Sequence, residues 1–209
     1  MVLGSTQPIK KVNIDHVRVG DAHIEPSTNV RNLGVMFDSA MKMDCQVTAL
    51  SKAAFMSIRN IGRIRDHLTR EAAETIVDAF ITSRIDSCNS LLYGINNAHL
   101  SRLQRIQNIA ARMITYTRKS DHITPVLANL HWLPIQQRVK NKLCLIIFKT
   151  LQGDAPAYLS DLVQLYAPGH RGLRSSQQKL LKENMANYRW GREAFKLLHQ
   201  AFEFPTWNC

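Results

Sequence analysis

The chain of 209 residues can hold one ordinary domain or two small ones, and a hydrophobic content of 45% is enough for a folded core. Its 27 Lys and Arg residues outnumber its 16 Asp and Glu residues, and the formal net charge of +11 favours an anionic partner such as nucleic acid or an acidic membrane. The longest apolar run, residues 143–148, is far below the roughly 18 residues of a membrane span, so no span is expected.

The N-terminal segment and the cysteines indicate an intracellular protein. The first residues lack the basic n-region and the long apolar h-region of a secretory signal. The four cysteines lie far apart, and none has a second Cys or a His at the spacing of zinc ligands. We therefore expect reduced thiols, a location in the cytoplasm or nucleus, and no metal or other cofactor.

The first 38 residues predict a small β element without a core of its own. Residues 16–19 and 22–24 flank the pair Gly20-Asp21, which is typical of a hairpin. Residues 30–37 are rich in β-branched and apolar side chains and predict one further strand.

Three amphipathic helices with short connections are predicted to follow. The first covers residues 43–68, the second begins at the N-cap Thr69 and stops near Gly94, and the third covers residues 98–114. Their apolar positions recur every three or four residues, which is the spacing of one helical face. The side chains expected in the core are Val47, Leu50, Ala54, Ile58, Ile61, Ile76, Phe80, Ile81, Ile85, Leu100, Leu103, Ile106, Ala110 and Met113.

Further helices are predicted at residues 125–130, 135–151, 156–166 and 192–202. The second of these is apolar on nearly all sides from Leu143 onward, so it should be a core element that Gly153 closes. The predicted fold is mainly α, with a small N-terminal β-hairpin and strand element, a helical bundle and further helices. Its predicted segments are residues 1–38, 43–115, 121–167 and a basic linker with a terminal helix at 168–209.

The basic excess is concentrated between Asp86 and Asp154, and cations also line the outer faces of the first and third helices. Between Asp86 and Asp154 the only acidic residue is Asp121. Arginine on the exposed face of a helix suits a phosphate backbone, although most runs of charge are only a solvated surface. Arg65 lies on the apolar side near the end of its helix and is expected to cap carbonyl groups. The candidate nucleic-acid-binding residues are Lys52, Arg59, Arg63, Arg102, Arg105, Arg112, Arg118 and Lys119.

No catalytic centre is visible in the sequence. Two-metal polymerases and nucleases need adjacent carboxylates, and the chain contains no Asp-Asp pair. Asp38, Asp44, Asp86 and Asp121 stand singly beside turns and helix starts, where capping is the expected role. Nucleophile elbows, phosphate-binding glycine loops and His-Glu-x-x-His helices are missing as well. Residue patterns alone therefore predict a basic helical protein with no catalytic residue and no small-molecule ligand.

Several segments together resemble the C-terminal part of LINE (non-long-terminal-repeat) retrotransposon reverse transcriptases of the jockey and chicken-repeat type. They are residues 30–38 (VRNLGVMFD), 79–89 (AFITSRIDSCN), 103–112 (LQRIQNIAAR), 123–127 (ITPVL), 130–134 (LHWLP), 155–159 (APAYL) and 173–175 (LRS). The resemblance extends over about residues 1–195, and its motifs are specific in combination.

The resemblance implies a polymerase part that begins after the catalytic aspartates, which in this family precede the segment similar to residues 11–14. Residues 1–38 would then be the last palm strands with a primer-grip-like hairpin, residues 43–115 the thumb, and the remainder a post-thumb region. Thumbs of this family hold the template-primer duplex through its backbone. A truncated copy of the element is the simplest explanation of the missing palm motif and of the family pattern that fades after Phe195.

Three functions remain open at this point. The first is sequence-independent binding of RNA or DNA, duplex or single strand, without catalysis. The second is a helical protein-interaction module, or a translated transposon remnant without a function, whose basic surface is incidental. The third, an intact polymerase, has the least support.

Overall fold

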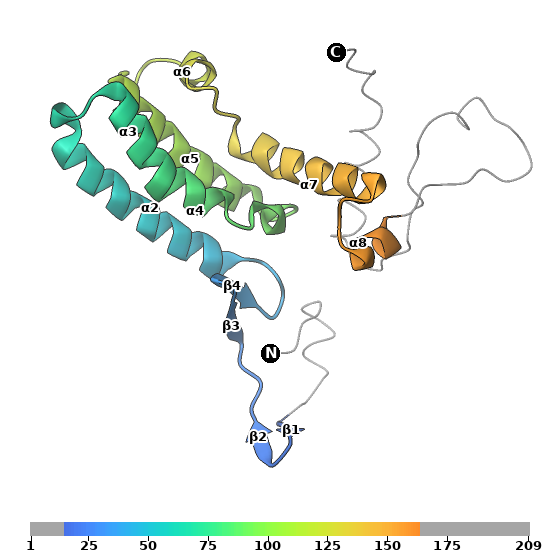
Figure 1. The fold of residues 1–209 in the computed structure, drawn as a ribbon. Helices are drawn as coiled ribbons and strands as arrows, with labels where there is room; N and C mark the ends of the chain where they lie inside the picture. The colour runs from blue at the N-terminus through green and yellow to red at the C-terminus, as the bar shows by residue number, and fades with distance from the viewer. Residues whose placement is uncertain (1–14, 164–209) are drawn as a thin grey trace, which may run out of the picture. The chain divides into compact units, whose positions relative to one another are not determined.

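The computed structural model describes residues 15–163, which form a mainly helical fold with two short N-terminal hairpins (Figure 1). This confirms the predicted fold class. The chain divides into two compact units, one from residues 1–88 with 95–135 and the other from residues 89–94 with 136–209. The predicted terminal helix at 192–202 and the predicted linker lie outside the described residues, as does the end of the predicted segment 121–167.

The β element of the first unit consists of two separate antiparallel hairpins. β1 (Val17–Val19) pairs with β2 (Ala22–Ile24) across Gly20, whose φ is 62°, and this confirms the predicted hairpin. The prediction of a single strand at 30–37 is wrong, because β3 (Asn29–Asn32) turns back into β4 (Val35–Asp38). Leu33 and Gly34 have φ angles of 47° and 85°, and two successive left-handed residues make a tight hairpin turn.

The long first helix, α2 (Asp44–Ile64), is followed directly by the 3₁₀ turn η1 (Arg65–His67). The carboxylate of Asp38 accepts hydrogen bonds from the backbone N–H groups of Ala40, Lys42 and Met43 at 3.1, 2.8 and 2.7 Å. These bonds fix the loop that leads into α2, so Asp38 stabilises a turn as expected for an acid beside one, but the N-cap of α2 is Met43, which has no side-chain cap. The predicted core positions Val47, Ala54 and Ile61 are buried, whereas Leu50 and Ile58 are half-buried.

The second helical run consists of α3 (Arg70–Val77), the π-helical turn η2 (Asp78–Thr82) and α4 (Ser83–Asp86). The side chain of Thr69 accepts a hydrogen bond from the N–H of Ala72 at 3.2 Å, which confirms the predicted N-cap. Ile81 and Ile85 are buried as predicted, but Ile76 is only half-buried and Phe80 is 51% exposed.

The π turn gives the physical reason for this error at Phe80. The buried residues of the run are Ala73, Val77, Ile81 and Ile85, which are spaced by four residues throughout. A regular α-helix of 3.6 residues per turn would rotate such a series steadily away from the core. The wider π turn takes up the extra residue, so the series stays in the core and Phe80 turns outward.

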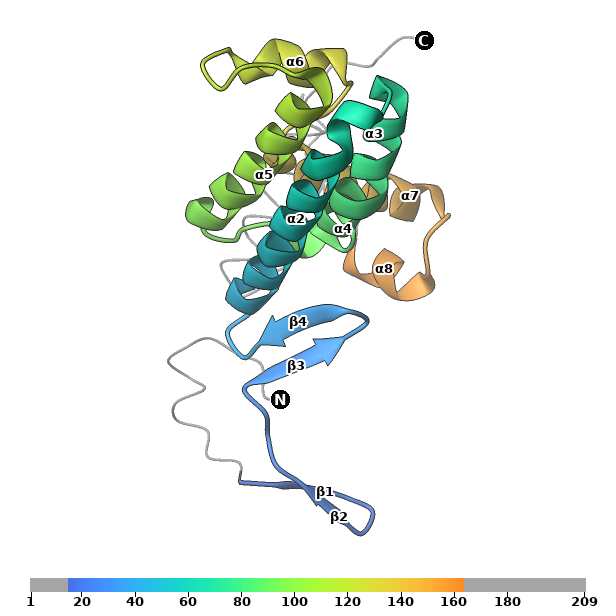
Figure 2. The ribbon, with the colours of Figure 1, turned by 90° about the vertical axis from the view of Figure 1, so that its left-hand side faces the viewer.

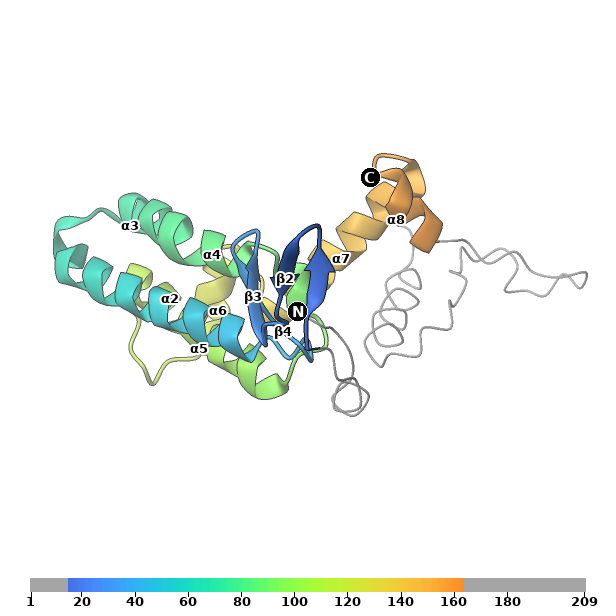
Figure 3. The same ribbon diagram turned by 90° about the horizontal axis from the view of Figure 1, so that it is seen from below.

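The third helix, α5 (Asn97–Thr115), completes a three-helix bundle. The side chain of Asn96 accepts a hydrogen bond from the N–H of Ala98 at 2.9 Å and caps the helix start. Leu103, Ile106 and Ala110 are buried as predicted. Both α2 and α3 pack against α5, and Figures 2 and 3 show α2, the α3–α4 run and α5 side by side.

Two short helical elements follow the second and third helical runs in the chain. η3 (Asn89–Leu92) clusters with the second unit, and α6 (Ile123–Asn129) packs on α5. The side chain of Gln104 on α5 accepts a hydrogen bond from the N–H of Ile135 at 2.9 Å, and Gln107 donates one to the carbonyl of Leu133 at 2.9 Å. These amides fasten the turn that follows α6 onto α5.

The described part of the second unit contains α7 (Ile135–Gln152) and α8 (Ala157–Leu162). Gly153 ends α7 with a φ of 84°, as expected for a glycine that terminates a helix. Ile147 is buried and contacts Leu151 and Val163. The expectation that the second half of α7 is covered all round is wrong for the described residues, because Leu145 and Phe148 are 45% and 52% exposed.

Candidate nucleic-acid interface

The helices α2 and α5 lie side by side and run in the same direction. At their N-terminal ends, Asp44 Oδ1 lies 2.6 Å from His99 Nε2. Near their C-terminal ends, a Cβ added to Gly62 would meet the Sδ of Met113 at 3.9 Å. The N-terminal ends of α2 and α5 are in contact, and so are their C-terminal ends. The two helices therefore pack along one line of contact, which we call the seam, and their outward faces lie on either side of it.

Five predicted site residues border this seam. Lys52, Arg59 and Arg63 follow one another along the side of α2 that is turned from the core, next to the position of Gly62. Arg102 stands one turn after His99 on α5, and Arg105 continues outward from it. All five side chains are exposed. We call this set the basic face; its members are Lys52, Arg59, Arg63, Arg102 and Arg105.

Acidic side chains are nearly absent from the two helices that carry the basic face. α5 contains no Asp or Glu, and the only acid in α2 is Asp44, which contacts His99. Within residues 15–163, none of the five cations forms an ion pair. Their charges are therefore not neutralised by neighbouring carboxylates of the described chain.

The other three predicted residues lie at the C-terminal end of α5. Arg112 is half-buried, and its Nη2 donates a hydrogen bond to the carbonyl of Asp121 at 3.0 Å. Arg118 and Lys119 are exposed in the loop, which the Asp121 carboxylate holds by accepting a hydrogen bond from the N–H of Arg118 at 3.2 Å. Arg112 thus supports the loop, while Arg118 and Lys119 remain exposed beside α5.

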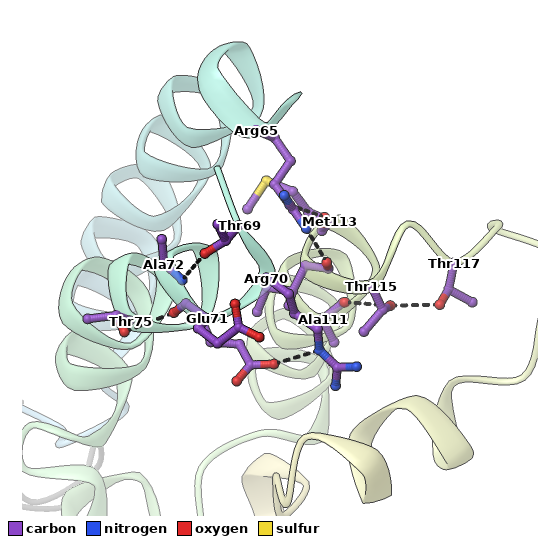
Figure 4. A network of polar contacts seen from close by, with 12 residues as sticks. Arg65, Thr69, Arg70, Glu71, Ala72, Thr75, Ala111, Met113, Thr115 and Thr117 are labelled. Carbon is purple, nitrogen blue, oxygen red and sulfur yellow. Dashed lines mark hydrogen bonds and ion pairs between the residues drawn. The ribbon is translucent and has the colours of Figure 1, made fainter. Parts of the chain in front are cut away.

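Arg65 has a different role from the exposed cations, and it is the role that its position predicted. Its guanidinium donates a hydrogen bond to the carbonyl of Met113 near the end of α5, at 3.0 Å (Figure 4). It also donates to the carbonyl of Ile114 at 2.6 Å and to the carbonyl of Leu68 at 2.8 Å. The side chain is buried, so this arginine satisfies helix-end carbonyls inside the protein. Arg65 is not part of the basic face.

Tyr116 covers the Arg65 guanidinium from the other side. The Arg65 Cζ lies 4.3 Å from the centre of the Tyr116 ring, and the Tyr116 hydroxyl donates a hydrogen bond to Asp66 at 3.0 Å. Desolvation, followed by this hydrogen bond to Asp66, raises the pKa of Tyr116 above its usual value. One face of the ring is therefore occupied by Arg65, although the residue as a whole is 62% exposed.

The α3–η2–α4 run has the opposite charge balance, and we call it the acidic helix. Arg70 pairs with Glu74 at 2.9 Å, and Arg84 is exposed. The Thr69 cap and the first turn of this helix are drawn in Figure 4. The acids of the run outnumber its two arginines and are Glu71, Glu74, Asp78 and Asp86.

One candidate contact residue was not chosen from the sequence. Phe55 lies on α2 between Lys52 and Arg59 and is 40% exposed, on the side of the helix that faces the seam. An exposed aromatic ring between cations is a common surface on which the bases of a single strand stack. The sequence carried a signal for it, because Phe55 lies one turn from each of these two cations.

In residues 15–163, no three His, Cys, Asp or Glu side chains come together so that they could hold a metal ion. No helix in the same range is long and apolar enough to cross a membrane.

No protein-family model, curated protein or solved structure matches this chain.

Proposed function

We propose that this chain binds the sugar-phosphate backbone of RNA or DNA, without sequence preference, through the basic face of α2 and α5. The observation that carries the proposal is a set of exposed cations on two parallel helices whose only acid is Asp44, at the N-terminal end of α2. Phosphates bound there would replace condensed counterions, which is the main source of sequence-independent affinity. Arginine adds forked hydrogen bonds to phosphate oxygens.

The surroundings of the basic face support backbone contact more than recognition of base edges. Gln104 donates to the side-chain oxygens of Gln107 and Asn108 at 2.9 and 2.8 Å, and its own oxygen binds the N–H of Ile135. Amide side chains are common readers of adenine, but these amides are engaged within the protein. The five cations of the basic face would contact the phosphates of any sequence alike.

We further propose that the chain is the thumb and post-thumb part of a LINE-type reverse transcriptase that binds its template-primer duplex but does not polymerise DNA by itself. The family resemblance of residues 79–89 and 103–112 supports this origin. The chain also contains no Asp-Asp pair that could hold catalytic metal ions. Primer extension by the purified chain alone would contradict this part of the proposal.

The binding proposal is tested by fluorescence anisotropy with labelled RNA–DNA duplexes of two unrelated sequences. With about five phosphate contacts, affinity should fall by several hundredfold between about 50 and 200 mM salt. Both sequences should bind with the same affinity within about threefold, since no base edge is read. Affinity that does not respond to salt would contradict the proposal.

The alternative of a helical interaction module, or of a remnant without function, makes a different prediction. A protein of that kind would unfold cooperatively on heating and yet show no affinity for either duplex at low salt. Thermal unfolding followed by circular dichroism on the same preparation separates this outcome from a simple failure to fold.

A further inference from the structure

The second half of α7 exposes apolar side chains on the side opposite its buried residues. Val139, Ile147 and Thr150 are buried, and Ile147 contacts Val163. On the other side, Leu145 is 45% exposed and Phe148 is 52% exposed. A helix that is apolar on nearly all sides is normally enclosed.

The exposed apolar residues of α7 form one continuous row. Leu145 and Phe148 are three residues apart, and Cys144 is four residues before Phe148, so the three side chains are neighbours on the helix surface. We call this row the α7 stripe. Cys144 is half-buried, and desolvation raises the pKa of its thiol. Single exposed apolar residues are ordinary, whereas a row of neighbours is typical of a contact surface.

The same chain supplies a segment that fits this stripe. Val163 is the last described residue and contacts Ile147, so the chain continues from a position beside α7. Residues 192–202, for which the sequence predicts a helix, have Phe195, Leu198 and Phe202 at the spacing of one helical face. At about 3.3 Å per residue, residues 164–191 reach much farther than the roughly 27 Å length of α7.

We propose that residues 192–202 dock on the α7 stripe, with Phe195, Leu198 and Phe202 packed against Leu145 and Phe148. This inference goes beyond the nucleic-acid proposal and does not depend on it. A second copy of the chain is a weaker occupant, because a stable dimer buries about 800 Å² per partner and the stripe offers only three side chains. A tethered segment also has an effective concentration in the millimolar range, which a separate partner lacks.

Cys144 provides a native reporter for the covered stripe. In the full chain with Cys45→Ser, Cys88→Ser and Cys209→Ser, its alkylation by iodoacetamide is followed by mass spectrometry. Leu198→Glu should release the segment and accelerate alkylation at least tenfold. The matched control Gln200→Glu places the same charge on the opposite side of the predicted helix and should leave the rate unchanged.

Two results would overturn the proposal. One is an equal alkylation rate in the parent chain and in Leu198→Glu. The other is a parent rate that increases on dilution, which identifies a second copy as the occupant.

A disulfide trap keeps the proposal testable if Leu198→Glu disturbs folding. In the same background, Leu198→Cys should form an intrachain disulfide with Cys144 under mild oxidation at least tenfold faster than Gln200→Cys. Similar rates for the two variants would show that residues 192–202 have no preferred orientation on α7, contrary to the proposal.

Discussion

The basic face and the acidic helix belong to one bundle, but their exposed side chains carry opposite net charge. Both α2 and the α3–η2–α4 run bury series of small and branched apolar residues, such as Val47, Ala54 and Ile61 in the one and Val77, Ile81 and Ile85 in the other. Their exposed residues differ, because α2 carries one acid and the acidic helix carries four against two arginines. Packing therefore does not require this separation of charge.

The separation of charge makes the electrostatic potential of the bundle positive on one side and negative on the other. On the proposed function, a polyanion would be attracted to the side of α2 and α5 and repelled by the carboxylates of the acidic helix. Such a field would orient a nucleic acid before any close contact forms. Substitutions in one of the two regions, or equivalent substitutions in both, test whether the two regions differ in their effects on stability and on binding.

The largest expected effect is the loss of stability in Arg65→Ala, which distinguishes the structural role of the buried arginine from that of the exposed ones. Removing its guanidinium leaves the carbonyls of Met113 and Ile114 without their donor and should cost about 3 kcal/mol of stability. Arg59→Ala, on the exposed side of α2, should change stability by less than about 0.5 kcal/mol. Urea unfolding followed by circular dichroism measures both, and equal costs would show that Arg65 is not a structural cap.

Charge reversal on the basic face should weaken binding without loss of stability. The variant with Arg59→Glu and Arg105→Glu is expected to lose at least tenfold in affinity for an RNA–DNA duplex, which corresponds to about 1.4 kcal/mol. The control is Arg84→Glu, an exposed arginine of the acidic helix with half the change in net charge, which should change affinity by less than about twofold. If Arg84→Glu weakened binding as much as the double variant, net charge rather than the basic face would explain the affinity.

Helix caps should matter equally in the two regions. Thr69 caps the acidic helix and Asn96 caps α5, each through one side-chain hydrogen bond to a backbone N–H. Thr69→Ala and Asn96→Ala should each cost about 1 kcal/mol of stability and should lower the unfolding temperature by similar amounts. A cost confined to one of the two would indicate that the other helix is held by packing alone.

The smallest expected effect is a pH dependence that belongs to the acidic helix. The backbone N–H of Glu71 and the Thr69 hydroxyl hold the pKa of the Glu71 carboxyl below its ordinary value of 4.5. A lowered pKa in the folded state contributes stability above pH 4.5, and this contribution is lost as the pH falls through the folded-state pKa. The difference in unfolding temperature between the parent chain and Glu71→Gln should therefore shrink from about pH 6 to about pH 3, and a constant difference would contradict this assignment.

Features that depend on neighbours in the chain could be predicted from the sequence. Thr69 stands directly before a helical pattern and Asp38 stands in a turn, so the N-cap formed by Thr69 and the turn held by Asp38 follow from local chemistry. The capping of carbonyls by Arg65 was also predictable, because a cation on the apolar side of a helix end has few other uses. Its main partners were not, since Met113 and Ile114 lie 48 and 49 residues farther along the chain.

Features that depend on an irregular backbone or on packing could not be predicted. Phe80 fitted the α-helical period and was assigned to the core, but a π turn at 78–82 changes the period at that point. The strand expected at 30–37 contains a turn that only the left-handed backbone of Leu33 and Gly34 reveals. The cations of the candidate site were found by spacing, whereas the parallel contact between α2 and α5 that unites them required the structure.

The most direct test of the proposed interface is the salt dependence of duplex binding before and after the basic face is neutralised. The parent chain is compared with a variant that carries Lys52→Gln, Arg59→Gln, Arg102→Gln and Arg105→Gln, by anisotropy over a range of salt concentrations. If these four residues contact phosphates, the slope of log affinity against log salt should become shallower by about 3 to 4. An unchanged slope in a folded variant would show that the nucleic acid binds elsewhere or not at all.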